Sequence, residues 1–87
     1  MNFQVAHFSR EHRYAVGTEL GSGRHYLAIP VSNALVDYEE HYLLTDRQFR
    51  DFLHDSAAAM AFADSCRRRE LDDLLFRQPG SDRGTPR

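Results

Sequence analysis

The feature that most constrains the fold of this chain is a change of hydrophobic period at Leu44 and Thr45. Before these residues, short runs of alternating apolar and polar residues are separated by turn residues, which is typical of β-strands. After them, apolar residues recur every three or four positions, which is typical of helices. Because the strands precede the helices, the order favours an α+β fold over an alternating βαβ fold. We predict an antiparallel β-meander of three to four strands over residues 2–44, with one face covered by two α-helices at 46–54 and 56–69.

A hairpin is predicted around the tripeptide Gly-Ser-Gly at residues 21–23, which separates two strand-like runs. A loop with an even number of residues, two or four, gathers the apolar side chains of both strands on one face, whereas an odd loop would divide them. In the even register Glu19 lies opposite Arg24, and we expect a weak ion pair between them. Gly17 then lies opposite Tyr26, so we expect either that the tyrosine ring covers the glycine or that a β-bulge occurs there.

The third long strand, residues 35–44, carries the residues that we single out as candidates for binding. Alternation separates a packed face from a face that points to solvent. The packed face comprises Val36, Tyr38, Glu40 and Tyr42, and the solvent face comprises Asp37, Glu39 and His41. Glu40 does not fit its face, so we expect either a bulge that shifts the phase or a partly buried carboxylate bonded to an arginine or a tyrosine hydroxyl. Same-face neighbours on a strand are roughly 6.5–7 Å apart, which seldom suits three ligands of one ion, and we predict no metal site.

The helical half begins with clear capping signals. In the capping box Thr45-Asp-Arg-Gln48, the threonine is the N-cap and the glutamine reaches back to its backbone. Asp55 or Ser56 can cap a second helix, whose alanine-rich sequence has high helix propensity. The sequence therefore predicts two helices with defined starts.

The apolar stripe of the second helix does not continue beyond Cys66. In a straight helix, the leucines at 71, 74 and 75 would project on roughly the opposite side. We predict a break near residues 69–71 followed by a short segment; the alternative is one long helix whose last turns face a second chain. Residues 1–76 form one predicted domain, and the polar residues 77–87 are predicted to be a flexible C-terminal tail with nothing to bury.

Composition limits the setting in which the protein is expected to act. The chain has 87 residues, a net charge of −2 and a single cysteine. It lacks an apolar run of about 18 residues and a secretory signal pattern, so we predict no membrane association and a reducing, cytoplasmic location. The sequence also lacks the familiar motifs for phosphate loops, zinc sites and activated nucleophiles, so we predict no cofactor and favour a non-catalytic protein.

The leading functional hypothesis is a protein-interaction module that docks an unidentified protein partner through its acidic strand, in the way that an immunity-type protein neutralises a basic effector. Tyrosine is enriched at interfaces, and acidic charge steers association with a basic partner. The candidate binding residues are Asp37, Tyr38, Glu39, Glu40, His41 and Tyr42.

Other hypotheses remain open. A small ligand-binding domain or enzyme would have a cleft around Glu40, Tyr38 and Tyr42, with Arg24 as a further lining residue. Nucleic-acid binding through Arg67, Arg68 and Arg69 ranks last, because these arginines are followed directly by acids. A homodimer is a further hypothesis, because the small core would leave the segment Leu-Asp-Asp-Leu-Leu-Phe at 71–76 without a partner.

Overall fold

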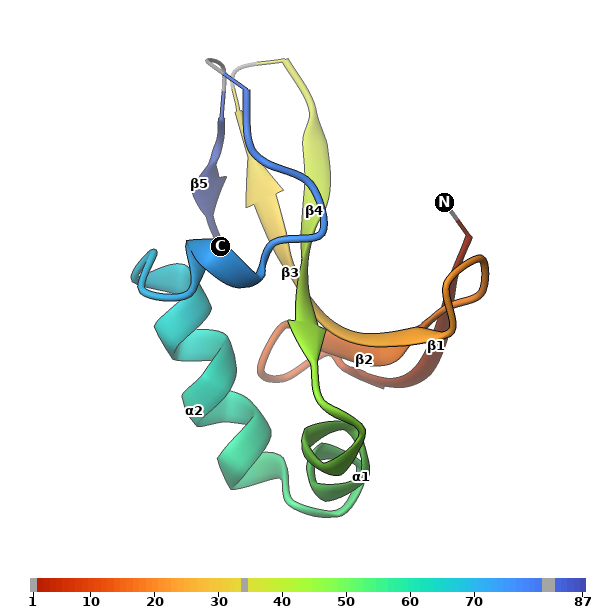
Figure 1. The fold of residues 1–87 in the computed structure, drawn as a ribbon. Coiled ribbons are helices and arrows are strands. Elements are labelled where there is room, and N and C mark those ends of the chain that lie inside the picture. The colour runs from red at the N-terminus through yellow and green to blue at the C-terminus, as the bar shows by residue number, and fades with distance from the viewer. Residues whose placement is uncertain (1, 34, 81–82) are drawn as a thin grey trace.

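The computed structural model describes residues 2–33, 35–80 and 83–87 of the chain. Four consecutive strands are followed by two α-helices, a 3₁₀ helix and a short fifth strand (Figure 1). The elements are β1 (Phe3–Ser9), β2 (Tyr14–Glu19), β3 (Arg24–Ser32), β4 (Asp37–Leu44), α1 (Asp46–His54), α2 (Ser56–Arg67), η1 (Asp72–Leu74) and β5 (Thr85–Pro86). The strand order is β1-β2-β3-β4 with antiparallel neighbours, so the predicted α+β fold is confirmed.

The β2–β3 hairpin has the even register that the apolar pattern predicts, with Val16 opposite Leu27. Its loop has four residues, 20–23, which was the longer of the two lengths that preserve the faces. Glu19 lies opposite Arg24, but its carboxylate accepts hydrogen bonds from two backbone N–H groups of the loop, at 2.8 and 2.9 Å. The expected ion pair between these two residues is therefore wrong, because the carboxylate closes the turn instead.

Gly17 lies between two close neighbours in the adjacent strands. It is opposite Tyr26 in β3 and opposite Val5 in β1, where the β1 register shifts between residues 5 and 7. A Cβ atom on Gly17 would lie 2.7 Å from Tyr26 Oη and 2.0 Å from the Gln4 carbonyl oxygen, so a larger residue does not fit without a shift of the backbone. Of the two alternatives predicted here, the covering tyrosine ring is correct; the β2–β3 register is continuous at Gly17, and the irregularity lies instead in the neighbouring strand β1.

The main core lies between one face of the sheet and the two helices (Figure 1). Strand residues at alternate positions supply the larger side chains, and the small residues of α2 let that helix lie close to them. Each fully buried large apolar side chain contributes roughly 1.5–3 kcal/mol to folding. The buried set comprises Tyr14, Val16, Leu27, Ile29, Val31, Tyr42, Leu44, Phe52, Ala59, Ala63 and Cys66.

The opposite face of the sheet carries a second, smaller apolar cluster. Ala15, Tyr26 and Ala28 are buried there, and Phe3 and Phe76 pack against them. These two phenylalanines come from the start of β1 and from the segment after η1, so segments far apart in the sequence contribute to this cluster. The sheet is thus covered by helices on one face only, as predicted, but its other face is not uniformly polar.

Both predicted helix starts are confirmed. The Gln48 N–H donates to Thr45 Oγ1 at 3.1 Å, and the Thr45 N–H donates to Gln48 Oε1 at 2.9 Å, which completes the capping box. Asp55 caps α2 through its side chain. The second helix ends at Arg67, slightly before the predicted boundary, and Arg69 follows with a positive φ of 63° that is incompatible with a continuing helix.

Beyond α2 the chain runs back along the sheet. The break predicted near residues 69–71 is present, and Leu75 forms a bridge to Tyr42 in β4. The leucines at 71, 74 and 75 pack against the main core of the same chain. The segment that suggested a homodimer is therefore covered within the chain, and this argument for a second copy no longer applies.

The C-terminal residues 83–87 return to the sheet. Thr85 and Pro86 pair with the end of β3, and the Arg87 N–H donates to the Pro30 carbonyl oxygen at 3.0 Å. The sequence predicted a tail over 77–87 that buries nothing, whereas Gly84 within it is buried. The reason is that β3 extends beyond β2 and offers a length of edge that a short strand can pair with.

Candidate functional site

Glu40 in β4 is the buried carboxylate around which the candidate site is built. The register of β4 with β3 is continuous through this position, where Glu40 lies opposite Ile29. The residue is 7% exposed, and its carboxylate accepts a hydrogen bond from Tyr42 Oη at 3.0 Å. Of the two predicted alternatives, the buried and hydrogen-bonded carboxylate is correct and the bulge is wrong.

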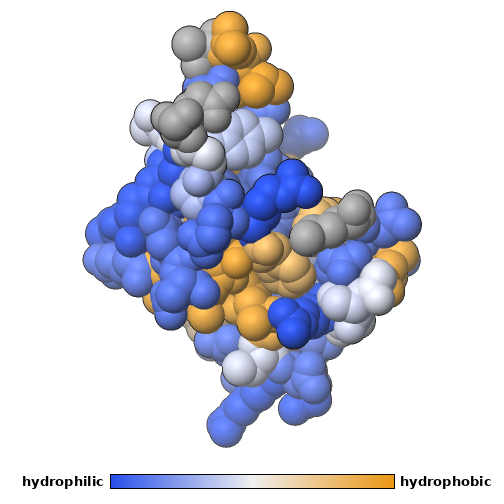
Figure 2. All heavy atoms as spheres, turned by 45° about the horizontal axis from the view of Figure 1, so that its top comes forward, coloured by the Kyte–Doolittle hydropathy of each residue, from blue (hydrophilic) through white to orange (hydrophobic). Residues whose placement is uncertain are grey.

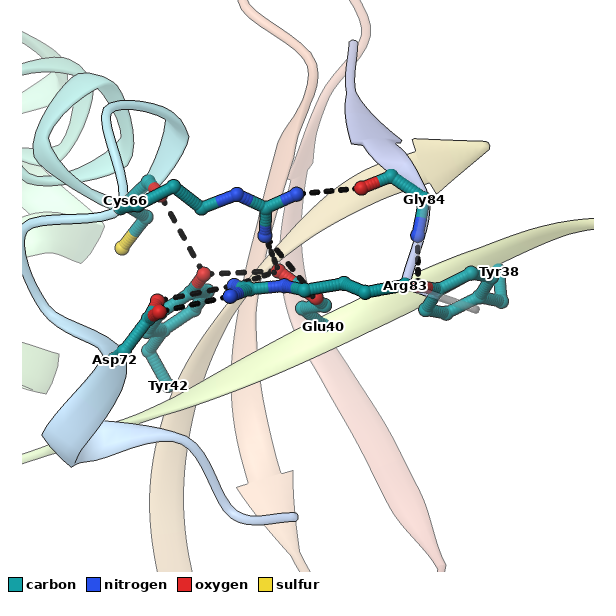
Figure 3. A network of polar contacts seen from close by, with 8 residues as sticks. Tyr38, Glu40, Tyr42, Cys66, Asp72, Arg83 and Gly84 are labelled. Carbon is teal, nitrogen blue, oxygen red and sulfur yellow. Dashed lines mark hydrogen bonds and ion pairs between the residues drawn. The ribbon is translucent and has the colours of Figure 1, made fainter. Parts of the chain in front are cut away.

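Two arginines from the C-terminal half of the chain donate to this carboxylate, and Figure 3 labels one of them, Arg83, beside Glu40. Arg69 Nη1 donates to Glu40 Oε1 at 3.0 Å, while Arg83 donates from Nε to Oε2 at 2.7 Å and from Nη2 to Oε1 at 3.0 Å. Arg83 also donates to both oxygens of Asp72, at 2.7 and 3.0 Å. One guanidinium thus bridges two carboxylates. We call these residues the Glu40 network: Glu40, Tyr42, Arg69, Asp72 and Arg83.

The Glu40 network holds its carboxylates in the ionised form. Burial alone would raise the pKa of Glu40, but hydrogen bonds from Arg83 and Tyr42 and the charges of both arginines outweigh it and lower that pKa. The hydrogen bonds from Arg83 likewise lower the pKa of Asp72. Burial, and then the bond to Glu40, raises the pKa of Tyr42. A general acid needs a carboxyl whose pKa is raised, so this arrangement suits a structural ion pair better than acid catalysis.

The predicted solvent face of β4 is confirmed for the two acids and wrong for the histidine. Asp37 and Glu39 are exposed, and Asp37 accepts a hydrogen bond from Ser32 Oγ. His41 is only partly exposed, and its ring stacks on Phe3 with the centroids 3.6 Å apart. Burial lowers the pKa of His41 to about 4. The histidine departs from the prediction because the aromatic cluster on this face covers it.

The end of the β3–β4 hairpin exposes apolar side chains. Leu35 is 91% exposed and Val36 is 55% exposed, although alternation predicted Val36 on the packed face. Val36 does not pack in the core because it precedes β4 and lies in a turn. In this turn Asn33 Oδ1 accepts hydrogen bonds from the N–H groups of Leu35 and Val36, at 2.8 and 2.9 Å. Figure 1 shows that this end of the hairpin projects away from the helices. We define the hairpin tip as Leu35, Val36, Asp37 and Glu39.

A cavity of about 500 Å³ opens beside β4. Its lining includes Val36 and Glu39 of the hairpin tip and residues 75–80, together with Tyr38 and Glu40. Tyr42 and Arg24, which were predicted to line a cleft with them, lie elsewhere: the tyrosine has no exposed surface, and the arginine begins β3 at its far end. The structure therefore brings together only part of the predicted cleft.

The arginines at 67–69 are held by contacts within the chain. Arg67 Nη2 donates to two backbone carbonyls of the turn before β2, at 2.6 and 2.8 Å. Arg68 pairs with Glu70 at 2.9 Å, and Arg69 pairs with Glu40. The three guanidinium groups point to three different partners, so they do not form a common surface for phosphate groups.

The remaining chemically reactive group is the thiol of Cys66, which has no exposed surface. Burial raises the pKa of this thiol to about 12, as befits a structural rather than a nucleophilic cysteine. Within residues 2–33, 35–80 and 83–87, no group of three histidine, cysteine or acidic side chains could hold a metal ion. No helix in this part of the chain is long and apolar enough to cross a membrane.

Sequence reasoning missed Asp72 and Arg83 and did not assign Arg69 to Glu40, having named it only as a candidate for nucleic-acid binding. The available signal was that Glu40 does not fit the packed face, which indicated a need for a cation. The sequence could not identify that cation, because all 11 basic residues of the chain are arginines.

No protein-family model, curated protein or solved structure matches this chain. The residues that carry the argument for function are therefore those of the hairpin tip and the Glu40 network.

Proposed function

We propose that the protein is a small non-catalytic binding module that docks a basic protein partner through the hairpin tip. The observation that supports this most directly is the exposure of Leu35 and Val36 next to two exposed acids, Asp37 and Glu39. Figure 2 shows hydrophobic atoms gathered at the projecting end of the molecule, separate from those nearer its centre. A small apolar patch with charged residues beside it has the composition of a docking surface.

The charge of the hairpin tip defines the partner that it fits. Glu39 makes no ion pair with any residue that the structure describes, and Asp37 is bonded only to a neutral hydroxyl among the contacts of its side chain. Two unneutralised carboxylates beside an apolar anchor favour a partner with an apolar recess bordered by lysines or arginines. In contrast, Glu40 is already neutralised within the chain and is not available to such a partner.

A second candidate function is the binding of a small molecule in the cavity beside β4. The observation in its favour is the volume of about 500 Å³, which lies within the usual range of ligand sites. The charged groups of Glu40 and Arg83 in its wall are directed at each other, which leaves them poorly placed to hold a ligand. This candidate therefore ranks below docking through the hairpin tip.

Photocrosslinking in a lysate of the source cells tests the docking proposal. A photoreactive residue at position 35 should capture a basic protein, whereas the same residue at position 53, another exposed leucine but on α1, should not. With the captured protein purified, the double charge reversal Asp37→Arg/Glu39→Arg should weaken binding at least about tenfold.

The matched control for this charge reversal is Glu11→Arg/Asp73→Arg, which changes the net charge equally at two exposed acids away from the hairpin tip. The control should bind as the unmodified protein does. Retention of every captured partner by Asp37→Arg/Glu39→Arg would show that the hairpin tip is not the docking surface.

A further inference from the structure

The C-terminal residues 83–87, which we call the arm, lie on the domain as a bound peptide would. We propose that the surface beneath the arm is a binding site for an extended peptide that contains Arg-Gly, and that the arm is a displaceable occupant of this site. Three groups of contacts carry the proposal: a free strand edge, a socket for an arginine side chain, and a position that admits only glycine.

The strand edge is supplied by the second half of β3. The neighbouring strand β2 pairs with β3 only over residues 24–28, and the arm pairs farther along at Val31 and Ser32. The Arg87 N–H extends this pairing by donating to the Pro30 carbonyl oxygen at 3.0 Å. Addition of a strand to an open sheet edge is a general mode of peptide recognition, in which backbone hydrogen bonds supply affinity and side-chain sockets supply specificity.

The arginine socket is formed by Glu40 and Asp72. Arg83 uses Nε, Nη1 and Nη2 to reach four carboxylate oxygens at 2.7 to 3.0 Å, and its side chain is 17% exposed. A lysine ammonium is a single point charge and cannot span two carboxylates in this way. If the arginine leaves, the buried carboxylate of Glu40 keeps only Arg69 as a cation. An empty socket is therefore unfavourable, and it should be filled preferentially by another arginine.

The residue after the arginine must be glycine. A Cβ atom on Gly84 would lie 2.4 Å from the backbone carbon and oxygen of Ser32. The Gly84 N–H donates to Tyr38 Oη at 2.8 Å, and its carbonyl oxygen accepts a hydrogen bond from Arg69 Nη2. The site thus binds both the N–H and the carbonyl group of the glycine, and it has no room for a side chain there (Figure 3).

The arm is held mainly by polar contacts that a separate peptide can reproduce. Among its five residues only Gly84 is fully buried, and residues 77–80, which lead towards it, are exposed. Segments with little apolar burial can open locally at less than the global unfolding free energy. Because the arm is covalently connected, a separate peptide competes with an effective concentration on the order of millimolar for a short linker.

This peptide site adds a second binding surface to the proposed function, and it adjoins the hairpin tip, because Arg87 Nη2 donates to Ser32 Oγ at 3.1 Å and that hydroxyl donates to Asp37. The socket residues Glu40 and Asp72 differ from the tip residues Asp37 and Glu39. Peptide binding can therefore fail while charge reversal at the hairpin tip still abolishes docking, and the reverse can also occur.

The test is a titration of the full chain with a fluorescent peptide of sequence Arg-Gly-Thr-Pro-Arg, monitored by anisotropy. In Gly84→Val the arm no longer fits, so the vacant site should bind this peptide at least about tenfold more tightly than the unmodified protein does. Thr85→Val, a change at an exposed position of the same arm, keeps the arm in place and should bind as weakly as the unmodified protein.

Changes in the peptide test the socket without altering the protein. Replacing the first arginine of the peptide by lysine, or its glycine by valine, should weaken binding to Gly84→Val at least about tenfold. Equal binding of the lysine peptide, or no saturable binding up to millimolar peptide, overturns the proposal. If circular dichroism shows that Gly84→Val does not fold, Arg83→Ala serves in its place. The peptide should then bind Arg83→Ala more tightly than it binds the unmodified protein, and it should raise the melting temperature of Arg83→Ala. If neither result is observed, the proposal is overturned.

Discussion

Glu40 carries a buried negative charge that two arginines share, and they approach it from different parts of the chain. Arg69 stands just after α2 with a left-handed backbone, and Arg83 belongs to the arm. Leaving a buried charge without its partner costs several kcal/mol, far more than the loss of an exposed pair. Glu40 therefore ties the positions of two otherwise weakly held segments to the centre of β4.

His41 should make the stability of the protein depend on pH in a defined window. Burial lowers its pKa from 6.5 to about 4, so between these values the unfolded chain binds a proton that the folded chain excludes. The free energy of unfolding should consequently fall as the pH falls from 6.5 to 4, by roughly 2–3 kcal/mol from this residue. Urea unfolding of the protein and of His41→Phe, which retains a ring to stack on Phe3, measures this contribution.

In His41→Phe the decrease of stability below pH 6.5 should be smaller, while above pH 7.5 the two proteins should show the same dependence on pH. Parallel stability curves from pH 4 to 8 would show that the imidazole is protonated as readily in the folded state as in the unfolded one.

At the scale of single residues, the sequence indicated what kind of group Glu40 needs beside it, but not which residue supplies that group. Alternation placed Glu40 on the packed face and left two alternatives, a bulge or a buried carboxylate bonded to an arginine or a tyrosine hydroxyl. The partners lie 29 and 43 residues farther along the chain, and no local pattern connects positions so distant. The partial burial of His41 was missed for the same reason, because the ring that covers it comes from Phe3 in β1.

Among the elements, α1 shows how strongly local chemistry defines a boundary. Its first turn contains both reciprocal bonds of the capping box, between residues only three positions apart. Such a signal is readable in the sequence because all its donors and acceptors lie within one helical turn. The contacts of the β2–β3 turn were harder to predict, because Glu19 can pair either with Arg24 or with the backbone of the loop. In the structure it bonds to the nearer backbone groups.

Removal of the capping hydroxyl should destabilise α1. Thr45→Ala leaves the N–H of Gln48 without its acceptor, and the free energy of unfolding should fall by about 1 kcal/mol. Arg50→Ala, at an exposed position within the same helix, should change it by less than about 0.5 kcal/mol. Urea unfolding monitored by circular dichroism gives both values, and an equal effect of the two substitutions would contradict the role of the cap.

For the whole molecule, the decisive contacts are those made by the arm. The fold class and the order of elements were predictable, because periodicity and capping are local properties. The return of the chain to β3 was not, because it depends on how far β3 extends beyond β2 and on the cation that Glu40 requires. Composition suggested a free tail at 77–87, whereas Arg83 and Gly84 have defined partners on the sheet.

Arg83 should therefore stabilise the whole domain, although it lies near the C-terminus. Arg83→Met removes the ion pairs with Glu40 and Asp72, and the free energy of unfolding should fall by about 2–3 kcal/mol, less than for a fully unpaired buried charge because Arg69 is still present. A double-mutant cycle with Glu40→Gln should give a coupling energy of at least about 1 kcal/mol. Additive effects of the two substitutions would refute the contribution of this ion pair.

The seam between α2 and the sheet contains the single cysteine of the chain, Cys66, with no exposed surface. An alkylating reagent can reach this sulfur only while the seam is open, so the rate of modification under native conditions counts the openings of that part of the molecule. Because the chain has no second thiol, the rate constant of alkylation reports only on local opening between α2 and the sheet.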